Sequence, residues 1–290
     1  MKNNEGWGAQ RWAIHLSQLL NATNPPDRYR FDVGVLAKDI SKNFFPGDPI
    51  MEVIGVDLED CEGALQPSLS GEKWGIYYST NCSPERQRFT AAHEFGHYLL
   101  HRKRYPQGFR SDEAAVDGRT KDDIEREANE FAATLLMPLD DFRRQISAKC
   151  QPNFDQLSAC ATRYDVSLVA VILRWLRYTE QSAIIVVSRD GFMKWAWSSE
   201  PAFKMGRYFK TSGSPIEVPL LSCVGRAKFD EQVRAGVQQP AGVWFDEPVR
   251  EFSVRSERYD LDYTLLHLRS AAAHVDLVEP HVEDTYDRFA

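Results

Sequence analysis

The chain has 290 residues, a net charge of −7 and a hydrophobic share of 43%, which is typical of a globular protein with two domains or one large and one small. No apolar run approaches the ~18 residues that a membrane-spanning helix needs, and the first residues lack the apolar stretch of a secretory signal. The acidic balance argues against a protein that coats nucleic acid, because such binding depends on neutralising phosphates.

The cysteines indicate the redox environment. Their number is odd and their spacing lacks the close pairs of a zinc ribbon, which favours reduced thiols over a disulfide framework. We therefore expect a cytoplasmic protein. The five cysteines are Cys61, Cys82, Cys150, Cys160 and Cys223.

The first eighty residues predict two helices followed by a small sheet. The spacing of apolar residues favours helices over 7–22 and 31–45, with Asn24-Pro25-Pro26 as a break between them. Short runs rich in aromatic and branched side chains then predict strands. These runs lie at 50–58, 62–65 and 73–79.

The next segment contains His93-Glu94-Phe95-Gly96-His97 in a run that reads as helix. Two histidines four residues apart lie about one turn apart on the same helix face, so both imidazoles can reach one metal ion. Glu94 is rotated to the side, where its carboxylate can accept a proton from water. The apolar neighbours predict a buried helix with Thr90 as its N-cap. Two hydrogen-bonded core histidines without a metal are the alternative.

A third ligand is expected, since zinc hydrolases usually combine three protein ligands with one open position for water. His101 follows on the same helix, but it lies about 12 Å from His93 along the axis, too far to share the ion. We expect His101 to support the site from outside or to lie at the surface.

The better source of the third ligand is the next helix, predicted over 122–137 from its apolar periodicity. Glu125 and Asn129 are neighbours one turn apart beside the apolar stripe. Glu125 could bind the metal, and the Asn129 amide could orient a ligand from behind. Glu127 is the alternative third ligand.

Residues 88–101 and 124–138 together resemble the ImmA/IrrE metallopeptidases. The resemblance implies a gluzincin-like core in a zincin-like domain. It assigns the metal ligands and the general base to four residues: His93, His97 and Glu125 as ligands, and Glu94 as the base. Zn²⁺ is the ion expected from this ligand set, and Mn²⁺ or Fe²⁺ could also bind.

The better-known ImmA/IrrE proteins inactivate repressors of the helix-turn-helix, phage repressor-like kind and so release stress-response or mobile-element genes. The resemblance therefore implies a DNA-binding repressor as protein substrate. A metal-stabilised protein that binds a repressor without cutting it is the alternative function. In a peptidase, strand 73–79 could lie at the sheet edge and align an extended peptide by strand addition.

Residues 154–178 predict two helices joined by a turn near Asp165, which is a helix-turn-helix-like arrangement. The second helix is mostly apolar, whereas a helix that reads DNA presents polar side chains to the base edges. We therefore predict a module that packs within the protein and does not contact nucleic acid directly.

Beyond residue 181 the pattern changes to strands. The segments 183–188 and 192–197 flank Asp190-Gly191, a strong hairpin signal. Further strands are expected at 216–224, 243–245 and 265–268, and a helix over 226–235.

The predicted fold class is α+β, with three domains along the chain. They are a zincin-like metallopeptidase domain over 1–145, a helix-turn-helix-like helical module over 146–180, and a mixed α/β domain over 181–290. The longest ImmA/IrrE proteins carry a GAF-like sensor at this last place. By analogy, residues 181–290 could form a GAF-like domain that binds a small-molecule or signal ligand.

Overall fold

The structure is a computed structural model, and its mixed α/β class agrees with the prediction. It divides into two compact units. Unit 1 contains the chain up to Asp141 together with Thr162–Ser167, and the rest of the described chain forms unit 2. The described residues are 6–23, 28–58, 62–108 and 121–269.

Residues 146–180 are divided between the two units, most of them in unit 2. The three-domain division with boundaries at 145 and 180 stays a prediction. No helix in the described part of the chain is both long and apolar enough to cross a membrane.

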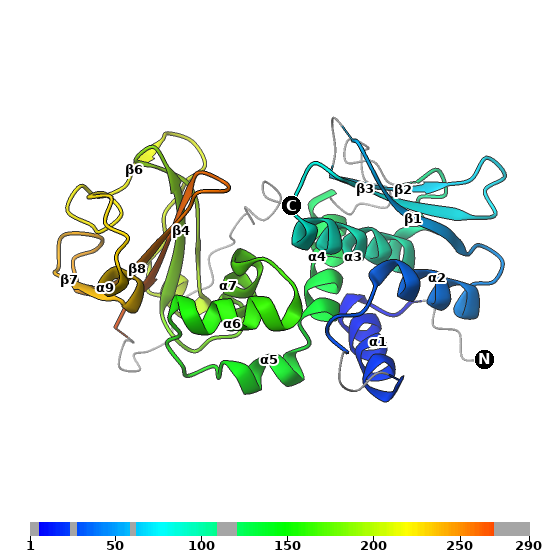
Figure 1. The fold of residues 1–290 in the computed structure, drawn as a ribbon, viewed down its shortest axis with the longest axis horizontal. Coiled ribbons are helices and arrows are strands. Elements are labelled where there is room, and N and C mark those ends of the chain that lie inside the picture. The colour runs from blue at the N-terminus through cyan, green and yellow to red at the C-terminus, as the bar shows by residue number, and fades with distance from the viewer. Residues whose placement is uncertain (1–5, 24–27, 59–61, 109–120, 270–290) are drawn as a thin grey trace. The chain divides into compact units, whose positions relative to one another are not determined.

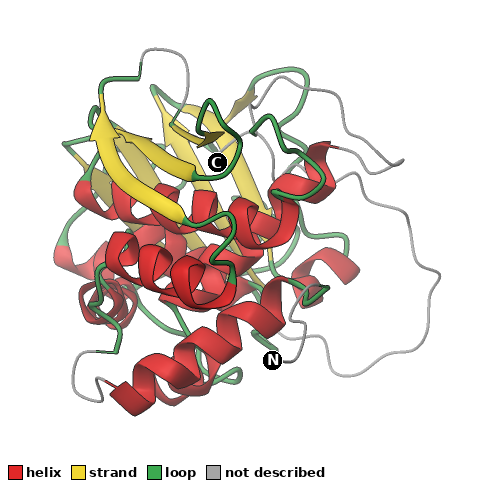
Figure 2. Ribbon diagram, turned by 90° about the vertical axis from the view of Figure 1, so that its right-hand side faces the viewer, coloured by secondary structure: helices red, strands yellow, loops and turns green. Residues whose placement is uncertain are grey.

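Unit 1 combines four helices with a three-stranded sheet (Figure 1). The sheet lies on one side of α3, and α1 packs against α4 on the other (Figure 2). Side chains from both layers form one core, including Trp12, Ile76, Phe95 and Phe131. The elements are α1 (Ala9–Thr23), α2 (Val33–Phe44), β1 (Ile50–Val56), β2 (Gly63–Pro67), β3 (Trp74–Ser79), α3 (Pro84–His101) and α4 (Lys121–Leu136).

The helix that carries the histidine motif is longer than expected. Thr90 is not its N-cap: α3 begins at Pro84, and the Ser83 side chain caps it by accepting the N–H of Arg86 at 3.3 Å. Proline is favoured at the first helical position because its fixed φ suits the helix and its missing N–H would have no partner there. Ser83-Pro84 is therefore a start signal, and Thr90 lies buried inside the helix.

The strand order of unit 1 is β1-β3-β2, with β3 parallel to β1 and antiparallel to β2. The expectation that strand 73–79 lies at an edge is wrong, because β3 is bonded to a strand on each side. Trp74, Gly75 and Ile76 are all buried, as a central strand requires. Among the described residues, β1 and β2 are the edge strands.

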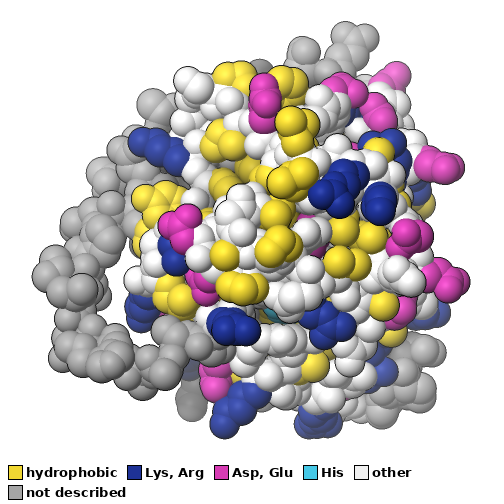
Figure 3. All heavy atoms as spheres, turned by 90° about the vertical axis from the view of Figure 1, so that its left-hand side faces the viewer, with side chains coloured by type: hydrophobic (Ala, Val, Ile, Leu, Met, Phe, Trp, Pro, Cys, Tyr) yellow, Lys and Arg dark blue, Asp and Glu magenta, His cyan; other side chains and the backbone are white. Residues whose placement is uncertain are grey.

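Unit 2 contains a six-stranded antiparallel sheet of order β6-β5-β4-β9-β8-β7. On the face drawn in Figure 3, charges of both signs lie among apolar side chains. The strands are β4 (Ala183–Arg189), β5 (Phe192–Ser198), β6 (Ile216–Glu217), β7 (Val237–Gln239), β8 (Val249–Ser256) and β9 (Leu261–His267). The helices are α7 (Leu168–Leu176), α8 (Glu200–Lys204) and α9 (Glu231–Ala235), while α5 (Leu139–Gln145) and α6 (Phe154–Tyr164) have residues in both units.

The hairpin of β4 and β5 and the pair α6–α7 are confirmed. Val171, Ile172 and Trp175 of α7 are fully buried, which fits a packing role for this helix. Three expectations in unit 2 are wrong: residues 243–245 are not a strand, the strand at 216–224 ends at Glu217, and the helix at 226–235 begins only at Glu231.

These errors share a physical cause. Apolar residues of the long segment between β6 and β8, such as Trp244 and Val224, pack into the core of the sheet without being strands. Conversely, β8 was missed because charged residues interrupt its apolar pattern, and one of them, Glu251, is completely buried.

Glu251 connects this irregular segment to the sheet. Its carboxylate accepts the backbone N–H groups of Cys223 at 3.0 Å and Val224 at 3.1 Å. It also accepts side-chain N–H groups from Gln239 at 2.8 Å and Trp244 at 3.0 Å. A buried carboxylate is tolerated when its oxygens are satisfied by such donors.

We expect Glu251→Gln to lower the free energy of unfolding by about 2–3 kcal/mol, because the new amide group would face donors that need an acceptor. The measurement is urea unfolding of the full chain followed by tryptophan fluorescence. Glu217→Gln, an exposed change on the same sheet, is the control. Equal unfolding midpoints for the two variants would contradict this role of Glu251.

Candidate metal centre

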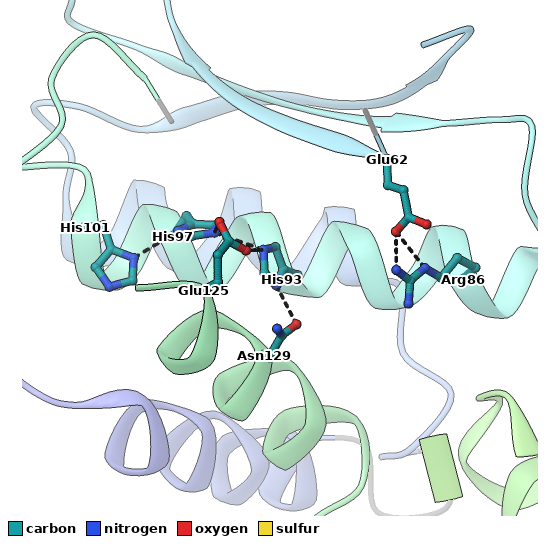
Figure 4. Close-up of polar contacts among 7 residues, drawn as sticks. All are labelled: Glu62, Arg86, His93, His97, His101, Glu125 and Asn129. Atoms are coloured by element: carbon teal, nitrogen blue, oxygen red, sulfur yellow. Dashed lines mark hydrogen bonds and ion pairs between the residues drawn. The ribbon is translucent and has the colours of Figure 1, made fainter. Parts of the chain in front are cut away.

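Three side chains converge where α3 packs against α4 (Figure 4). The Nε2 atoms of His93 and His97 lie 2.9 Å apart. Glu125 places Oε2 at 3.0 Å from Nε2 of His93 and Oε1 at 3.5 Å from Nε2 of His97. One ligand atom from each residue lies within 4.8 Å of the others. Two imidazoles and one carboxylate facing a common point fit the donor set of a divalent metal ion.

A close approach of the two helices creates this cluster. A β-carbon at Gly96 would stand 3.0 Å from the Phe131 ring and 3.3 Å from the backbone of Ala128. The small residues at 96 and 128 therefore let α3 and α4 approach closely. The histidine pair from α3 then meets the Glu125 carboxylate from α4.

Glu94 is buried beside the cluster and is not one of the converging ligands. Its Oε2 has no hydrogen-bond partner in the described part of the chain. Burial raises the pKa of Glu94 to about 7, against the opposing charge of His93 and with a smaller contribution from Glu125. A carboxylate with this pKa can accept and return a proton near neutral pH.

Gly63 of β2 leaves the space that the Glu94 carboxylate occupies. A β-carbon at position 63 would stand 2.7 Å from Oε1 of Glu94 and 2.5 Å from Cγ2 of Thr90. The start of β2 is tied to α3 by Arg86, whose Nε donates to Glu62 at 2.7 Å (Figure 4). Gly63 carries no signal of this role in the sequence, since only the strand–helix packing shows why a glycine is needed there.

The charges at the cluster favour a cation. Burial opposes protonation of His93, but its hydrogen bond to Glu125 and the charges of Glu94 and Glu125 outweigh burial and raise its pKa. Burial and the neighbouring charge of His93 lower the pKa of His97 to about 3. Burial alone would raise the pKa of Glu125, but its bonds with the two histidines hold that pKa well below the usual range. His97 is therefore neutral, the form that can bind a metal ion.

The outer nitrogens of the two histidines have different partners. Nδ1 of His93 lies 2.9 Å from Oδ1 of Asn129, the contact expected of an orienting amide. Nδ1 of His97 lies 3.0 Å from Nδ1 of His101, and Nε2 of His101 lies 3.1 Å from Oε2 of Glu127. Of the two glutamates considered as third ligand, Glu125 thus faces the histidine pair, while Glu127 contacts His101.

His101 is 1% exposed, so it supports the site from outside and does not lie at the surface. The signal was present in the sequence, since His97 and His101 are also four residues apart on the same helix. Its contact with His97 agrees with the expectation that His101 supports the site from outside.

Comparison with known proteins points in the same direction as this cluster. Residues 54–176 match the profile of the peptidase M78 family, described as the IrrE N-terminal-like domain. This match covers less than half of the chain and is consistent with the ImmA/IrrE family of metallopeptidases. No curated protein matches the chain significantly. A solved structure of a Mycobacterium tuberculosis transcriptional regulator is similar at 13% identity, with a TM-score of 0.49, over 89% of this chain and 76% of that chain.

We expect Gly63→Ala to reduce peptide cleavage by ~10-fold or more, because the methyl group would displace the Glu94 carboxylate that we take as the proton acceptor. Zinc affinity should stay within about twofold, since the ligand cluster is separate. Cleavage rate and zinc affinity are measured on the same preparations. The control is Gly47→Ala, where an added β-carbon meets nothing within 4 Å. Cleavage as fast as in the control would refute the contact with Glu94.

Proposed function

We propose that this chain is a metal-dependent endopeptidase that cleaves a DNA-binding repressor of the helix-turn-helix kind and so derepresses stress-response or mobile-element genes. The observation that carries the proposal is the convergence of two imidazoles and the Glu125 carboxylate beside the buried carboxylate of Glu94. The match of residues 54–176 to the model of a metallopeptidase family supports the reaction class. The repressor as substrate rests on the resemblance of the motifs on α3 and α4.

In this proposal His93, His97 and Glu125 hold the metal ion, for which Zn²⁺ is the first candidate and Mn²⁺ or Fe²⁺ the alternatives. A metal ion held there would supply Lewis acidity towards water and towards the carbonyl of the scissile peptide bond. Glu94 accepts the proton of the attacking water and returns it to the leaving amine. Asn129 holds the ring of His93 in place through Nδ1.

The edge strand β2 is our candidate for aligning the substrate. The backbone N–H of Ser79 donates to the carbonyl of Glu62 at 2.8 Å, and that of Ser68 donates to the carbonyl of Lys73 at 2.7 Å. In an antiparallel pair, alternate residues of a strand direct their backbone groups towards the partner strand. Gly63, next to Glu62, therefore directs its N–H and C=O away from β3. An extended peptide that pairs with β2 at this point would pass directly beside Glu94.

For residues 181–290 we propose a sensing role, as a GAF-like domain that binds a small-molecule or signal ligand. The proposal rests on the place of this region in the chain by analogy with long family members. We also propose a cytoplasmic location. It is supported by the odd number and scattered spacing of the five cysteines in the sequence.

The direct test is intact-mass analysis of helix-turn-helix repressors from the same cells after incubation with zinc- or manganese-loaded protein. We expect one cut by the unaltered protein. Glu94→Gln should bind the metal but cleave ~100-fold more slowly or less, because it lacks the proton acceptor. A Glu94→Gln protein that cleaves at the normal rate would refute the mechanism.

The alternative, a metal-stabilised protein that only binds the repressor, gives a different result in cells. In that case Glu94→Gln would derepress the target genes as the unaltered protein does, whereas His97→Ala would not. A peptidase requires that both variants fail.

A further inference from the structure

A chain of hydrogen bonds leads from the metal cluster towards the surface of α4. It begins at Nδ1 of His97, which lies 3.0 Å from Nδ1 of His101, and ends where Nε2 of His101 lies 3.1 Å from Oε2 of Glu127. The side chains of both histidines are 1% exposed, whereas that of Glu127 is 32% exposed. Figure 4 shows the contact between the two histidine rings.

The carboxylate of Glu127 decides which atoms donate and which accept in this series of hydrogen bonds. We take Glu127 as ionised; its carboxylate can then only accept hydrogen bonds, so Nε2 of His101, 3.1 Å away, would carry the proton. A neutral His101 then has a lone pair on Nδ1, which accepts from His97. His97 in turn carries its proton on Nδ1 and directs the lone pair of Nε2 into the cluster. This is the tautomer that a metal ligand at Nε2 needs.

The other histidine ligand reaches the same tautomer in another way. Nδ1 of His93 faces the amide oxygen of Asn129, a neutral acceptor. Behind His97 the acceptor is an imidazole that is itself polarised by a carboxylate, and hydrogen bonds in such a chain strengthen one another. The partners behind His97 should therefore strengthen its Nε2 as a metal ligand more than Asn129 strengthens that of His93.

We infer that Glu127 is a positioning residue for the metal centre: through His101 it sets the tautomer of His97 and strengthens metal binding without touching the ion. This inference rests on the proposed function, because it takes His97 as a metal ligand. A purely structural role, in which the His101–Glu127 pair only joins α3 to α4, makes different predictions.

The first test is the affinity for Zn²⁺, measured by competition with a chromophoric chelator. We expect Glu127→Gln to weaken binding ~10- to 100-fold, as loss of a partner behind a ligand typically does. The matched control is Glu130→Gln, which removes the same charge from the same helix, at a residue bonded to Gln10 at 2.6 Å. The control should bind zinc within about twofold of the unaltered protein.

The second test reads the tautomer directly, by ¹⁵N NMR of the His97 ring in the metal-free protein. The unaltered chain and Glu130→Gln should show the proton on Nδ1 only, whereas Glu127→Gln should show a mixture, since an amide can donate as well as accept. A structural link between helices would leave this signal unchanged.

A rescue experiment tests His101, the buried residue between His97 and Glu127. His101→Phe should weaken zinc binding, whereas His101→Gln should recover part of the loss, because its amide can accept from His97 and donate to Glu127. Circular dichroism and the melting temperature of the metal-free variants show whether each one folds. Equal zinc affinities of folded His101→Gln and His101→Phe would count against the inference.

The outcomes distinguish a failure of the proposed function from a failure of the inference about Glu127. If the unaltered chain does not bind zinc stoichiometrically, or if His93→Ala binds it equally well, the proposed function fails. If both behave as expected but Glu127→Gln matches Glu130→Gln in affinity and tautomer, only the role of Glu127 is overturned.

Discussion

A β-carbon at Gly96 would stand 3.0 Å from the Phe131 ring and 3.3 Å from the backbone of Ala128, so the absence of a side chain at residue 96 helps α3 and α4 to pack this closely. The metal centre depends on that packing, since two ligands come from α3 and the third from α4. The spacing of residues within each helix then places the functional side chains. His93 and His97 lie one turn apart on α3, and Glu125 and Asn129 lie one turn apart on α4. α3 therefore presents two imidazoles to the cluster, while α4 presents one carboxylate to it and one amide to the outer nitrogen of His93.

Burial of this point sets the chemistry of its groups. Interactions between charges are stronger where water is excluded, so the histidine pair and Glu125 interact strongly, and burial raises the pKa of Glu94 to about 7. The same side chain needs room, which Gly63 of β2 leaves. The edge strand thus does two things in the proposed mechanism: it gives space to the proton acceptor and offers backbone groups to a peptide beside it.

The two histidine ligands share one fold element but differ in what lies behind them. Asn129 contacts His93 from α4, and the His101–Glu127 pair lies behind His97. All of these partners come from the same two helices as the ligands. The packing that assembles the cluster therefore also orients its imidazoles.

Features that depend on neighbours within one helix could be predicted from the sequence. The histidine motif, the position of Glu94 and the pairing of Glu125 with Asn129 all follow from a period of 3.6 residues, and the structure brings the three expected ligands together. The early helices, the three strands of unit 1 and the β4–β5 hairpin were predicted to within a few residues. Their signals are local as well.

Features that depend on contacts between distant segments could not be predicted. The central place of β3 depends on which strands pair, and the need for glycine at position 63 depends on a helix that follows it in the chain. In unit 2, β8 was not predicted because Glu251 interrupts its apolar pattern. This carboxylate is nevertheless buried and accepts hydrogen bonds from four donors of the preceding segment. Tertiary contacts decide such positions, and composition does not reveal them.

The central claim is that two imidazoles and the Glu125 carboxylate hold the ion. X-ray absorption spectroscopy of the zinc-loaded chain, with Glu125→Gln beside it, tests this most directly. We predict a first shell of nitrogen and oxygen only at about 2.0–2.2 Å, with two imidazoles, and a shell that changes in Glu125→Gln. Sulfur at about 2.3 Å, or identical spectra from the two proteins, would contradict the assignment.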